Sequence, residues 1–494
     1  MCGIAGVFNK SAPTDVAAML GNLAHRGPDG EGMVDLADCT LGHRRLAIID
    51  VEYGKQPMCV DETWIVFNGE IYNYQELAPE HLQDVTLSTH SDTEVLIRLY
   101  QKYGPRCVEL LRGMFAFAIF DEHGFFMARD PLGIKPLYCG DADDAFYFAS
   151  EIKALCPVTD HIREFPAGHW YHSRKGWQAY YDVHAETISP GTEADAVQSI
   201  RQIIQDAVRL RMVADVPVGI SLSGGLDSSI IAMLASQETE HLHSFAVGMA
   251  GSEDLAAARR MAKRLGNRHH ERIYTEQEML AALPHVIRHL ESFDPALVRS
   301  AIPNYFLAEL ASQYVKVILT GEGADEIFAG YDYLADYDEP LHLQTEMIQI
   351  TTSLHNTNLQ RADRIAMAFG LEARVPFLDT SSVALGLGLP PEWKLHKDKP
   401  AKYLLRQAFA ADLPAEITNR PKQKFSAGAG SQQVLVQLAE REISDLEFET
   451  EFARLQSRWG YRLPNKEALY YYRILRQNFE DRWIFPTMGS SRSL

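Results

Sequence analysis

The 494-residue sequence contains few cysteines, and no pattern groups them. Its six cysteines form no Cys-x-x-Cys pair and have no companion histidines at the spacing of a zinc site. The adjacent residues His269 and His270 match no metal-binding motif either. We therefore expect neither a disulfide framework nor a structural zinc ion.

Long apolar runs and basic clusters are also missing. The longest apolar runs, such as residues 114–120, fall far short of the roughly 18 residues that indicate a membrane span. A formal net charge of −19 disfavours extended binding to the phosphate backbone of a nucleic acid. No basic segment followed by an apolar stretch and a cleavage site occurs near the start of the sequence. These absences predict a cytoplasmic protein that binds neither membranes nor nucleic acids.

What the sequence does contain is the composition of a globular protein that is long enough for two or more domains. In the first part, Gly, Asp, Asn and Pro turns separate short apolar stretches, as is typical of antiparallel sheet. These stretches are 3–8, 64–71, 115–120 and 145–149. One amphipathic helix is expected around residues 16–23, and a second should open at Ser91, with Glu94 completing a capping box. The pattern predicts an α+β domain with layered antiparallel sheets.

From about residue 195 the pattern changes to alternating helix and strand. An amphipathic helix covers 197–208, and strands are expected at 216–222, 244–248 and 315–320, with helices between them. This order predicts an α/β domain whose parallel sheet is covered on both faces and whose ligands lie beyond the carboxyl ends of the strands. Residues 189–192 supply loop chemistry and a helix start. We therefore predict two domains, 1–190 and 191–494.

Cys2 is the first candidate catalytic residue. Removal of the initiator methionine would place its thiol and a free α-amino group on one residue, so the amine could accept the thiol proton at neutral pH. Position alone does not distinguish such a nucleophile from an inert cysteine, but the surrounding motifs do. These are 2–6 (CGIAG), 25–30 (HRGPDG), 43–46 (HRRL), 68–73 (NGEIYN), 129–133 (RDPLG) and Ser150-Glu151.

Together these motifs resemble the glutaminase domain of amidotransferases with an amino-terminal nucleophile, which has the Ntn-hydrolase fold. The resemblance implies that the side-chain amide of Asn68 and the backbone N–H of Gly69 form an oxyanion hole, with Asn68 also contacting glutamine. It places Arg45 at the α-carboxylate of glutamine and Glu70 and Asp92 at its α-ammonium group, which are chemically suitable partners.

The segment 223–229 (SGGLDSS) carries a second kind of chemistry. It follows an alternating strand that ends at Leu222 and precedes a buried helix, so its glycines, hydroxyls and helix amino-terminus can hold phosphate groups. It contains no lysine, and it resembles the pyrophosphate-binding loop of enzymes that split ATP into AMP and pyrophosphate. The predicted ATP-binding residues in this segment are Leu222, Ser223, Gly224, Gly225, Asp227 and Ser228.

A second loop, 320–326 (TGEGADE), should leave the end of a neighbouring strand and face the same crevice. Thr320 and Gly321 are therefore predicted to bind ATP, and Asp227 and Asp325 are the predicted Mg²⁺ ligands. The family resemblance further implies a catalytic role for Glu322, an adenine contact for Val247 and, in the basic loop 420–425, stabilisation of phosphate charge by Lys422.

Taken over nearly the whole chain, the sequence resembles the asparagine synthetases that use glutamine. The resemblance implies an enzyme with glutamine, aspartate and ATP as substrates, a requirement for Mg²⁺, a homodimer, and an interdomain passage for ammonia. The family-like stretches 371–379 and 468–473 are expected to shape the fold rather than to react. An RNA-modifying enzyme would need a basic module, and a catalytically silent protein would not need Cys2, Asn68, Asp227, Glu322 and Lys422 together.

The acceptor site departs from the family pattern. Ala296 and Leu297 precede Arg299 where aspartate-specific relatives usually carry a threonine pair, and Asn358 stands where many relatives have aspartate. Arg299 can still bind a carboxylate. Aspartate is the expected acceptor, and amidation of a different carboxylate in a specialised biosynthetic pathway is the alternative.

Overall fold

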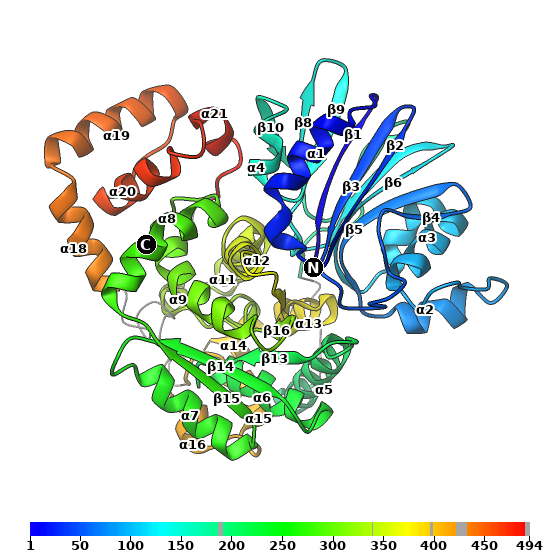
Figure 1. Ribbon diagram of the computed structural model, residues 1–494. Coiled ribbons are helices and arrows are strands. Elements are labelled where there is room, and N and C mark those ends of the chain that lie inside the picture. Colours follow the sequence, from blue (N-terminus) through cyan, green and yellow to red (C-terminus); the bar gives the residue numbers. More distant parts are fainter. Residues whose placement is uncertain (186–190, 338, 396–398, 421–431, 490–494) are drawn as a thin grey trace.

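Two six-stranded antiparallel sheets form the amino-terminal part of the chain (Figure 1). The computed structural model describes residues 1–185, 191–337, 339–395, 399–420 and 432–489. The first sheet has the order β10-β8-β9-β1-β3-β2, and the second has the order β12-β11-β7-β6-β5-β4. The strands are β1 (Gly3–Phe8), β2 (Gly30–Leu36), β3 (Cys39–Arg45), β4 (Met58–Val60), β5 (Thr63–Ile71), β6 (Gly113–Asp121), β7 (Gly124–Arg129), β8 (Tyr138–Ala142), β9 (Ala145–Ala149), β10 (His161–Glu164), β11 (His169–His172) and β12 (Gly176–Ala179).

The two sheets pack face to face, and helices cover their outer faces. Ile4, Leu41, Val66, Phe125 and Phe148 belong to the apolar layer between the sheets. Helices α1 (Pro13–Asn22) and α4 (Ile152–Leu155) pack on the first sheet, whereas α2 (Tyr74–His81) and α3 (Asp92–Tyr103) pack on the side of the second. The predicted α+β layered domain is confirmed.

A five-stranded parallel sheet organises the rest of the chain, with the order β15-β14-β13-β16-β17. Its strands are β13 (Val218–Ser221), β14 (His243–Gly248), β15 (Arg268–Ile273), β16 (Val317–Leu319) and β17 (Glu372–Arg374). Ala246 faces a core shared with α5 (Glu193–Arg211) and α6 (Leu226–Glu238), whereas Phe245 and Val247 face a core shared with α8 (Glu276–Leu290) and α9 (Pro295–Ala311). Both faces of the sheet are therefore covered, as predicted.

The remaining helices surround this sheet and extend beyond it. They are α7 (Glu253–Leu265), α10 (Ala324–Ile327), α11 (Pro340–Thr352), α12 (Asn358–Met367), α13 (Thr380–Gly388), α14 (Pro391–Lys394), α15 (Tyr403–Phe409), α16 (Ala415–Thr418), α18 (Gln432–Glu442), α19 (Asp445–Trp459), α20 (Lys466–Leu475) and α21 (Asp481–Ile484). The last four form a separate group beside α8 in Figure 1, whereas the amino-terminus lies where the two sheet systems meet.

The sequence predicted the starts of helices α5 and α3 correctly, but it predicted one helix cap incorrectly. Thr192 caps α5 through a reciprocal contact with Asp195, at the predicted helix start. Ser91 caps α3, but the expected capping box with Glu94 is wrong, because the Glu94 carboxylate instead accepts hydrogen bonds from the N–H groups of Ser88 and Thr89. Glu94 thus orders the loop before the helix rather than the first turn.

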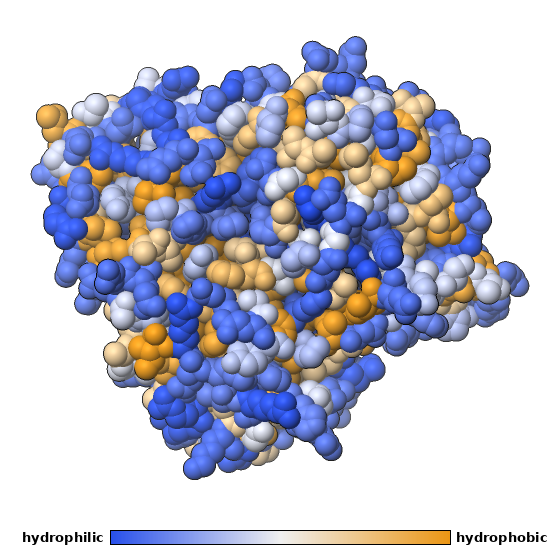
Figure 2. All heavy atoms as spheres, in the orientation of Figure 1, coloured by the Kyte–Doolittle hydropathy of each residue, from blue (hydrophilic) through white to orange (hydrophobic). Residues whose placement is uncertain are grey.

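The outer surface carries no extended apolar belt on the face seen in Figure 2, where hydrophobic residues are scattered among hydrophilic ones. Among the described residues, none of the helices is long and apolar enough to cross a membrane.

Candidate active sites

Cys2 lies immediately before β1, and most of the residue is buried. Its backbone N–H donates a 3.0 Å hydrogen bond to Oδ1 of Asn68, and its carbonyl oxygen accepts from Nε of Arg26 at 2.9 Å. Burial raises the pKa of the Cys2 thiol. With Met1 still attached, the nitrogen of Cys2 belongs to a peptide bond and cannot act as a base, so the described chain holds the thiol in an unactivated state.

Asn68 and Gly69 supply donors beside this thiol. Asn68 lies in β5 and is fully buried; because its oxygen accepts from Cys2, its Nδ2 amide is left with no hydrogen-bond partner among the described residues. A buried amide donor of this kind is costly unless a ligand uses it. Gly69 has φ +156°, and a Cβ there would lie 2.1 Å from the carbonyl oxygen of Met114. This geometry is compatible with the predicted oxyanion hole, because the Nδ2 amide of Asn68 is left for a ligand oxygen.

The predicted glutamine-binding carboxylates lie close together. Asp92 opens α3 and accepts a 3.0 Å hydrogen bond from the N–H of Ile71, while Glu70 lies in β5. Burial raises the pKa of Asp92 to about 6, and burial together with Glu372 and Asp92 raises the pKa of Glu70 well above its usual range. Crowded, buried carboxylates favour an added cation, which is what the α-ammonium group of an amino acid provides.

Arg45 ends β3 and is held apart from those carboxylates. Its guanidinium donates to the backbone oxygens of Asp50 at 2.7 Å and Val51 at 2.8 Å. Within the described part of the chain, no ion pair joins Arg45 to Glu70 or Asp92. These two bonds use two of the five N–H donors of the guanidinium, so the others are left for the predicted contact with a glutamine carboxylate.

Glu372 and Arg374 were not expected in this pocket. Both come from β17 of the parallel sheet, and the α-ammonium group of Met1 lies 2.9 Å from the Glu372 carboxylate. Arg374 pairs with Glu372 at 2.6 Å and lies 3.8 Å from Glu70. The sequence assigned the stretch 371–379 to the fold alone, and no local signal could show that two of its side chains reach across to the first domain.

The first of the two predicted ATP-binding loops follows β13 and leads into α6. Gly224 adopts φ +68°, and a Cβ there would lie 2.5 Å from Cβ of Ala257 in α7. The hydroxyls of Ser223 and Ser228 lie 3.1 Å apart, and the N–H of Gly225 donates to Ser223 at 3.4 Å. The loop therefore collects hydroxyls and N–H groups at the amino-terminus of a 13-residue helix, as an anion-binding loop requires.

The second loop follows β16, the strand next to β13, so both loops meet at one edge of the sheet as predicted. Asp227 and Asp325 converge on a single cation there: Nζ of Lys402 lies 2.5 Å from Asp227 and 2.7 Å from Asp325. Burial opposes the charge of Lys402, but the two carboxylates outweigh burial and raise its pKa.

Two carboxylates that already share one cation form a donor set that suits Mg²⁺. Within the described ranges, no group of three or more His, Cys, Asp or Glu residues is arranged to hold a metal ion. An ion at this edge would therefore need further oxygen ligands from phosphate groups, which is the usual situation for Mg²⁺ at a nucleotide. No local pattern in the sequence indicates this role for Lys402, because Lys402 lies 175 positions from Asp227.

Between the loops lies a cavity of about 310 Å³. Of the predicted residues, those that line it are Ser223, Gly225, Asp227, Ser228, Arg299, Thr320, Gly321, Glu322 and Asp325. Leu222 is buried and donates its N–H to Phe245, and Val247 is buried in β14 without lining the cavity. Lys422 lies outside the described residues, although the preceding Arg420 donates to the carbonyl oxygen of Ser223 at 3.2 Å.

The part of the cavity that holds the predicted acceptor residue Arg299 contains paired charges. Arg361 lies 2.5 Å from Glu322, and Arg299 pairs with Glu467 of α20. Asn358 also lines the cavity, and its amide donates a hydrogen bond to Glu326 at 3.2 Å. Because this side chain is an amide, it supplies no carboxylate to the cavity.

The two candidate sites share one strand as a wall. Leu371 and Ala373 line the ATP cavity, whereas Glu372, between them, reaches the amino-terminus. Neighbouring side chains of a strand point to opposite faces, so β17 and its preceding residue divide the cavity from the Cys2 pocket.

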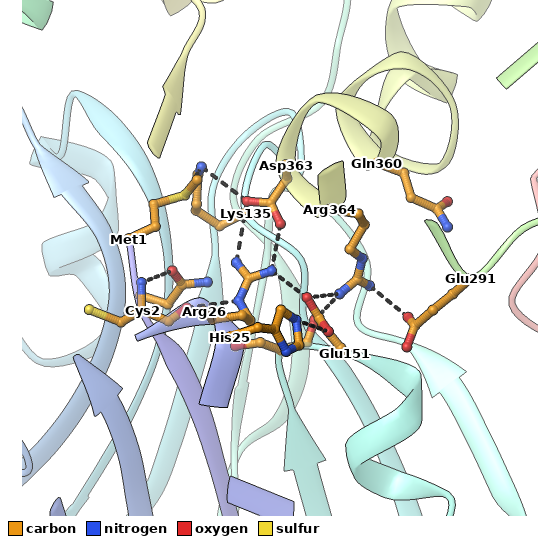
Figure 3. A network of polar contacts seen from close by, with 12 residues as sticks. Met1, Cys2, His25, Arg26, Lys135, Glu151, Glu291, Gln360, Asp363 and Arg364 are labelled. Carbon is orange, nitrogen blue, oxygen red and sulfur yellow. Dashed lines mark hydrogen bonds and ion pairs between the residues drawn. The ribbon is translucent and has the colours of Figure 1, made fainter. Parts of the chain in front are cut away.

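A buried polar network closes the same boundary (Figure 3). Arg26 pairs with Asp363 of α12 at 2.8 Å and with Glu151 at 2.6 Å. Lys135 reaches Asp363 at 3.3 Å, and Arg364 lies 3.2 Å from Glu151. Helix α12 therefore carries Arg361 on the cavity side and Asp363 and Arg364 on the side of the first domain.

Comparison with known proteins also distinguishes two parts of the chain. A model of the glutamine amidotransferase domain matches residues 1–181, and a model of asparagine synthase matches residues 199–342 and 335–483. The chain is 38% identical over 532 residues to a probable glutamine-hydrolysing asparagine synthetase of Schizosaccharomyces pombe, covering 98% of this chain and 94% of the relative. It is 38% identical over 519 residues to asparagine synthetase B of Escherichia coli (99% and 92% covered) and 37% identical over 513 residues to an asparagine synthetase of Zea mays (97% and 86% covered).

Proposed function

Because the chain belongs to the family of glutamine-hydrolysing asparagine synthetases, we propose that it converts glutamine, aspartate, ATP and water into glutamate, asparagine, AMP and pyrophosphate. The observation that carries the proposal is the joint presence of a cysteine beside an unused buried amide donor and an ATP-loop cavity on the far side of β17. One site would release ammonia and the other would use ATP, and we propose that residues 1–190 and 191–494 are the corresponding domains.

The first half-reaction releases ammonia at Cys2. Once Met1 is removed, the freed α-amine of Cys2 accepts the thiol proton, and the thiolate attacks the side-chain carbonyl carbon of glutamine. Nδ2 of Asn68 and the N–H of Gly69 donate to the oxygen that becomes negative. The amine returns the proton to the leaving nitrogen, ammonia departs, and water then hydrolyses the glutamyl thioester to glutamate.

Glutamine is held by charge complementarity. Its α-ammonium group enters between Glu70 and Asp92, where removal of Met1 takes one positive charge away from Glu372. Arg45 is proposed to bind the α-carboxylate, because a guanidinium and a carboxylate form paired hydrogen bonds between opposite charges.

The second half-reaction activates the acceptor. ATP binds with its phosphates on the loops at Ser223 and Thr320, and the β-carboxylate of aspartate attacks the α-phosphorus, releasing pyrophosphate. Asp227 and Asp325 would hold Mg²⁺, which supplies positive charge to the phosphate oxygens. Lys402 keeps the two carboxylates together, and Lys422 is proposed to bind the same phosphate charge.

The adenylated acceptor then reacts with the ammonia that was released at Cys2. Ammonia attacks the acyl carbon of the adenylate, AMP leaves, and Glu322 is proposed to accept the proton that the new amide sheds. Arg299 is proposed to bind the remaining carboxylate of the acceptor, and Val247 to contact adenine.

We also propose that the protein is cytoplasmic and that it forms a homodimer, the second of which the family resemblance implies. Light scattering after size-exclusion chromatography tests the oligomeric state directly, and a monomeric mass would contradict it.

One set of assays tests the function. The purified protein is incubated with ATP, Mg²⁺ and a panel of carboxylic acids that includes aspartate, with either glutamine or ammonium as the nitrogen source, while pyrophosphate and amide are measured. Aspartate should yield equal amounts of pyrophosphate and asparagine. Failure with aspartate would refute the proposed acceptor.

The Cys2→Ala variant separates the two sites. It should lose synthesis supported by glutamine and retain synthesis supported by ammonium, while Cys59→Ala, at an exposed position, should behave as the wild type. Mass spectrometry of the wild type should show the loss of Met1. Unchanged use of glutamine by Cys2→Ala would rule out the proposed nucleophile.

A further inference from the structure

Glu467, in the first turn of α20, binds the guanidinium that the proposed function assigns to the acceptor. Nε of Arg299 donates to both carboxylate oxygens of Glu467, at 2.8 and 3.1 Å, and Nη2 contacts the same carboxylate. The Glu467 side chain is 3% exposed and that of Arg299 is 15% exposed, so the pair is largely shielded from water. Shielding strengthens the interaction and makes the loss of either partner costly.

Glu467 is itself fixed in place. The hydroxyl of Tyr471, one turn further along α20, donates to its Oε1 at 2.7 Å, and the ring of Tyr471 is fully buried. Asn465 caps α20 by accepting from the N–H of Ala468. The carboxylate therefore also lies at the favourable, amino-terminal end of a helix that packs on α8 and α9.

The contact uses only one edge of the arginine. A guanidinium offers two forks of donors, one formed by Nε and one Nη group and the other by the two Nη groups. Glu467 occupies the fork that contains Nε. Because Arg299 also lines the cavity, its second fork is the part that a ligand there can reach.

We infer that Glu467, held by Tyr471, is a positioning residue that orients Arg299 so that its Nη fork faces the carboxylate of the acceptor. This inference rests on the proposed role of Arg299 in acceptor binding. It also gives a function to the stretch 468–473 and its flank, which the sequence assigned to the fold alone. Without Glu467, Arg299 would be free to rotate and to pair with other acids that line the cavity, such as Glu322.

The test uses three single variants in the ammonium-supported reaction, so that the Cys2 site plays no part. Glu467→Gln weakens the grip on Arg299, Tyr471→Phe removes the hydroxyl that holds Glu467, and Tyr470→Phe is the matched control on the neighbouring residue. KM is measured separately for the acceptor, ATP and ammonium. The acceptor is aspartate or, if the wild type does not use aspartate, whichever acid of the panel it amidates.

We expect Glu467→Gln to raise KM for the acceptor about tenfold or more, as the loss of a charge-assisted contact does, with KM for ATP changed less than about twofold. Tyr471→Phe should shift the acceptor KM in the same direction by a smaller factor, and Tyr470→Phe should leave it unchanged. If Glu467→Gln does not fold, Tyr471→Phe alone decides the matter through the same KM values.

A double-mutant cycle shows whether Glu467 acts through Arg299. In an Arg299→Lys background, Glu467→Gln should have little further effect on the acceptor KM. An acceptor KM that stays at the wild-type value in both Glu467→Gln and Tyr471→Phe, or that falls because the carboxylate competes with the acceptor, would overturn the inference. Failure of the wild type with aspartate would instead count against the proposed acceptor, and is seen before any variant is compared.

Discussion

Three buried carboxylates meet beside Cys2, and their ionisation governs what the pocket can bind. Glu70, Asp92 and Glu372 raise one another's cost of ionisation, while Arg374 and the amino-terminal ammonium group of Met1 offset part of that cost. Burial opposes the ionisation of Glu372, but these two cations lower its pKa. Loss of Met1 would move the amino-terminal amine from beside Glu372 to Cys2, and the α-ammonium group of a bound glutamine would bring a positive charge to these carboxylates.

The pH dependence of glutamine binding follows from Asp92. Because burial raises its pKa to about 6, the side chain is neutral below that pH and becomes an anion as the pH rises through it. The dissociation constant of glutamine, measured by calorimetry with the non-hydrolysing Cys2→Ala variant, should therefore fall between pH 5 and pH 7.5. Asp92→Asn in the same background should bind more weakly at pH 7.5 and lose much of this dependence.

Glu76→Gln is a suitable control, since Glu76 is an exposed acid of α2 in the same domain. It should leave the pH profile of glutamine binding unchanged. A dissociation constant that does not vary across this pH range in the Cys2→Ala protein would contradict the role of Asp92.

At this scale, the sequence identified residues that belong to contiguous motifs and missed those that act across the chain. Cys2, Asn68 and Asp227 stand in recognisable local patterns; the structure places Cys2 beside Asn68, and Asp227 on the wall of the cavity. Lys402, Glu372 and Glu467 carry no local signal, because each meets its partner only after folding brings distant segments together.

Among the elements, the turn from β13 to α6 has a strict backbone requirement. Gly224 combines φ +68° with a close approach to α7, where an added Cβ would lie 2.6 Å from the backbone carbonyl carbon of Ala257. A left-handed conformation alone costs a residue other than glycine roughly 1–2 kcal/mol. The clash with backbone adds to that cost, because α7 cannot yield as a flexible side chain would.

Gly224→Ala should therefore lower the melting temperature and abolish pyrophosphate formation while leaving glutamine hydrolysis in place. Gly225→Ala is the matched control for stability, since the nearest atom to its added Cβ is Ser223 Oγ at 3.4 Å. Calorimetry and a glutaminase assay compare the two variants. Equal melting temperatures for both would show that the turn tolerates a side chain.

Helix α12, like β17, touches both sites, and its polar side chains pair with residues of the first domain. Asp363 is 3% exposed and lies between Arg26 and Lys135. Asp363→Asn would remove the carboxylate that pairs with Lys135 and one of the two that pair with Arg26, and loss of a buried charge partner typically costs about 3–5 kcal/mol. We expect a lower melting temperature and a larger loss of glutamine-supported than of ammonium-supported synthesis.

The control for Asp363→Asn is Glu449→Gln, an exposed acid of α19. Its effect on stability should stay within about 0.5 kcal/mol, as is usual for surface positions. Equal losses of the two synthetic activities in Asp363→Asn would mean that α12 does not link the sites.

The elements were easier to predict than their assembly. Apolar periodicity located the strands that it predicted to within two residues, because one face of each is buried in a core. It did not predict other strands, such as β7, β15 and β17. Glu94 shows where local logic fails: the sequence offered a capping box, but the preceding loop provides more N–H groups for its carboxylate. Which face of α12 meets which domain depends on packing that no single segment encodes.

At the scale of the whole molecule, β17 places two chemistries back to back. Glu372 reaches the pocket of the nucleophile, and Ala373 lines the ATP cavity, so one strand separates the source of ammonia from the proposed site of its use. We propose that ammonia crosses this boundary, which would keep it from being protonated in bulk water. The motifs predicted each site, whereas the strand they share became evident only from the fold.

The most direct measurement follows the nitrogen atom through the whole protein. Wild-type enzyme is supplied with glutamine labelled with ¹⁵N in its side-chain amide, together with aspartate, ATP and Mg²⁺, and the products are quantified by NMR and a pyrophosphate assay. We expect ¹⁵N in the side-chain amide of asparagine, with one pyrophosphate formed for each labelled asparagine. Labelled ammonium accumulating without labelled asparagine, or asparagine forming without pyrophosphate, would contradict the proposed function.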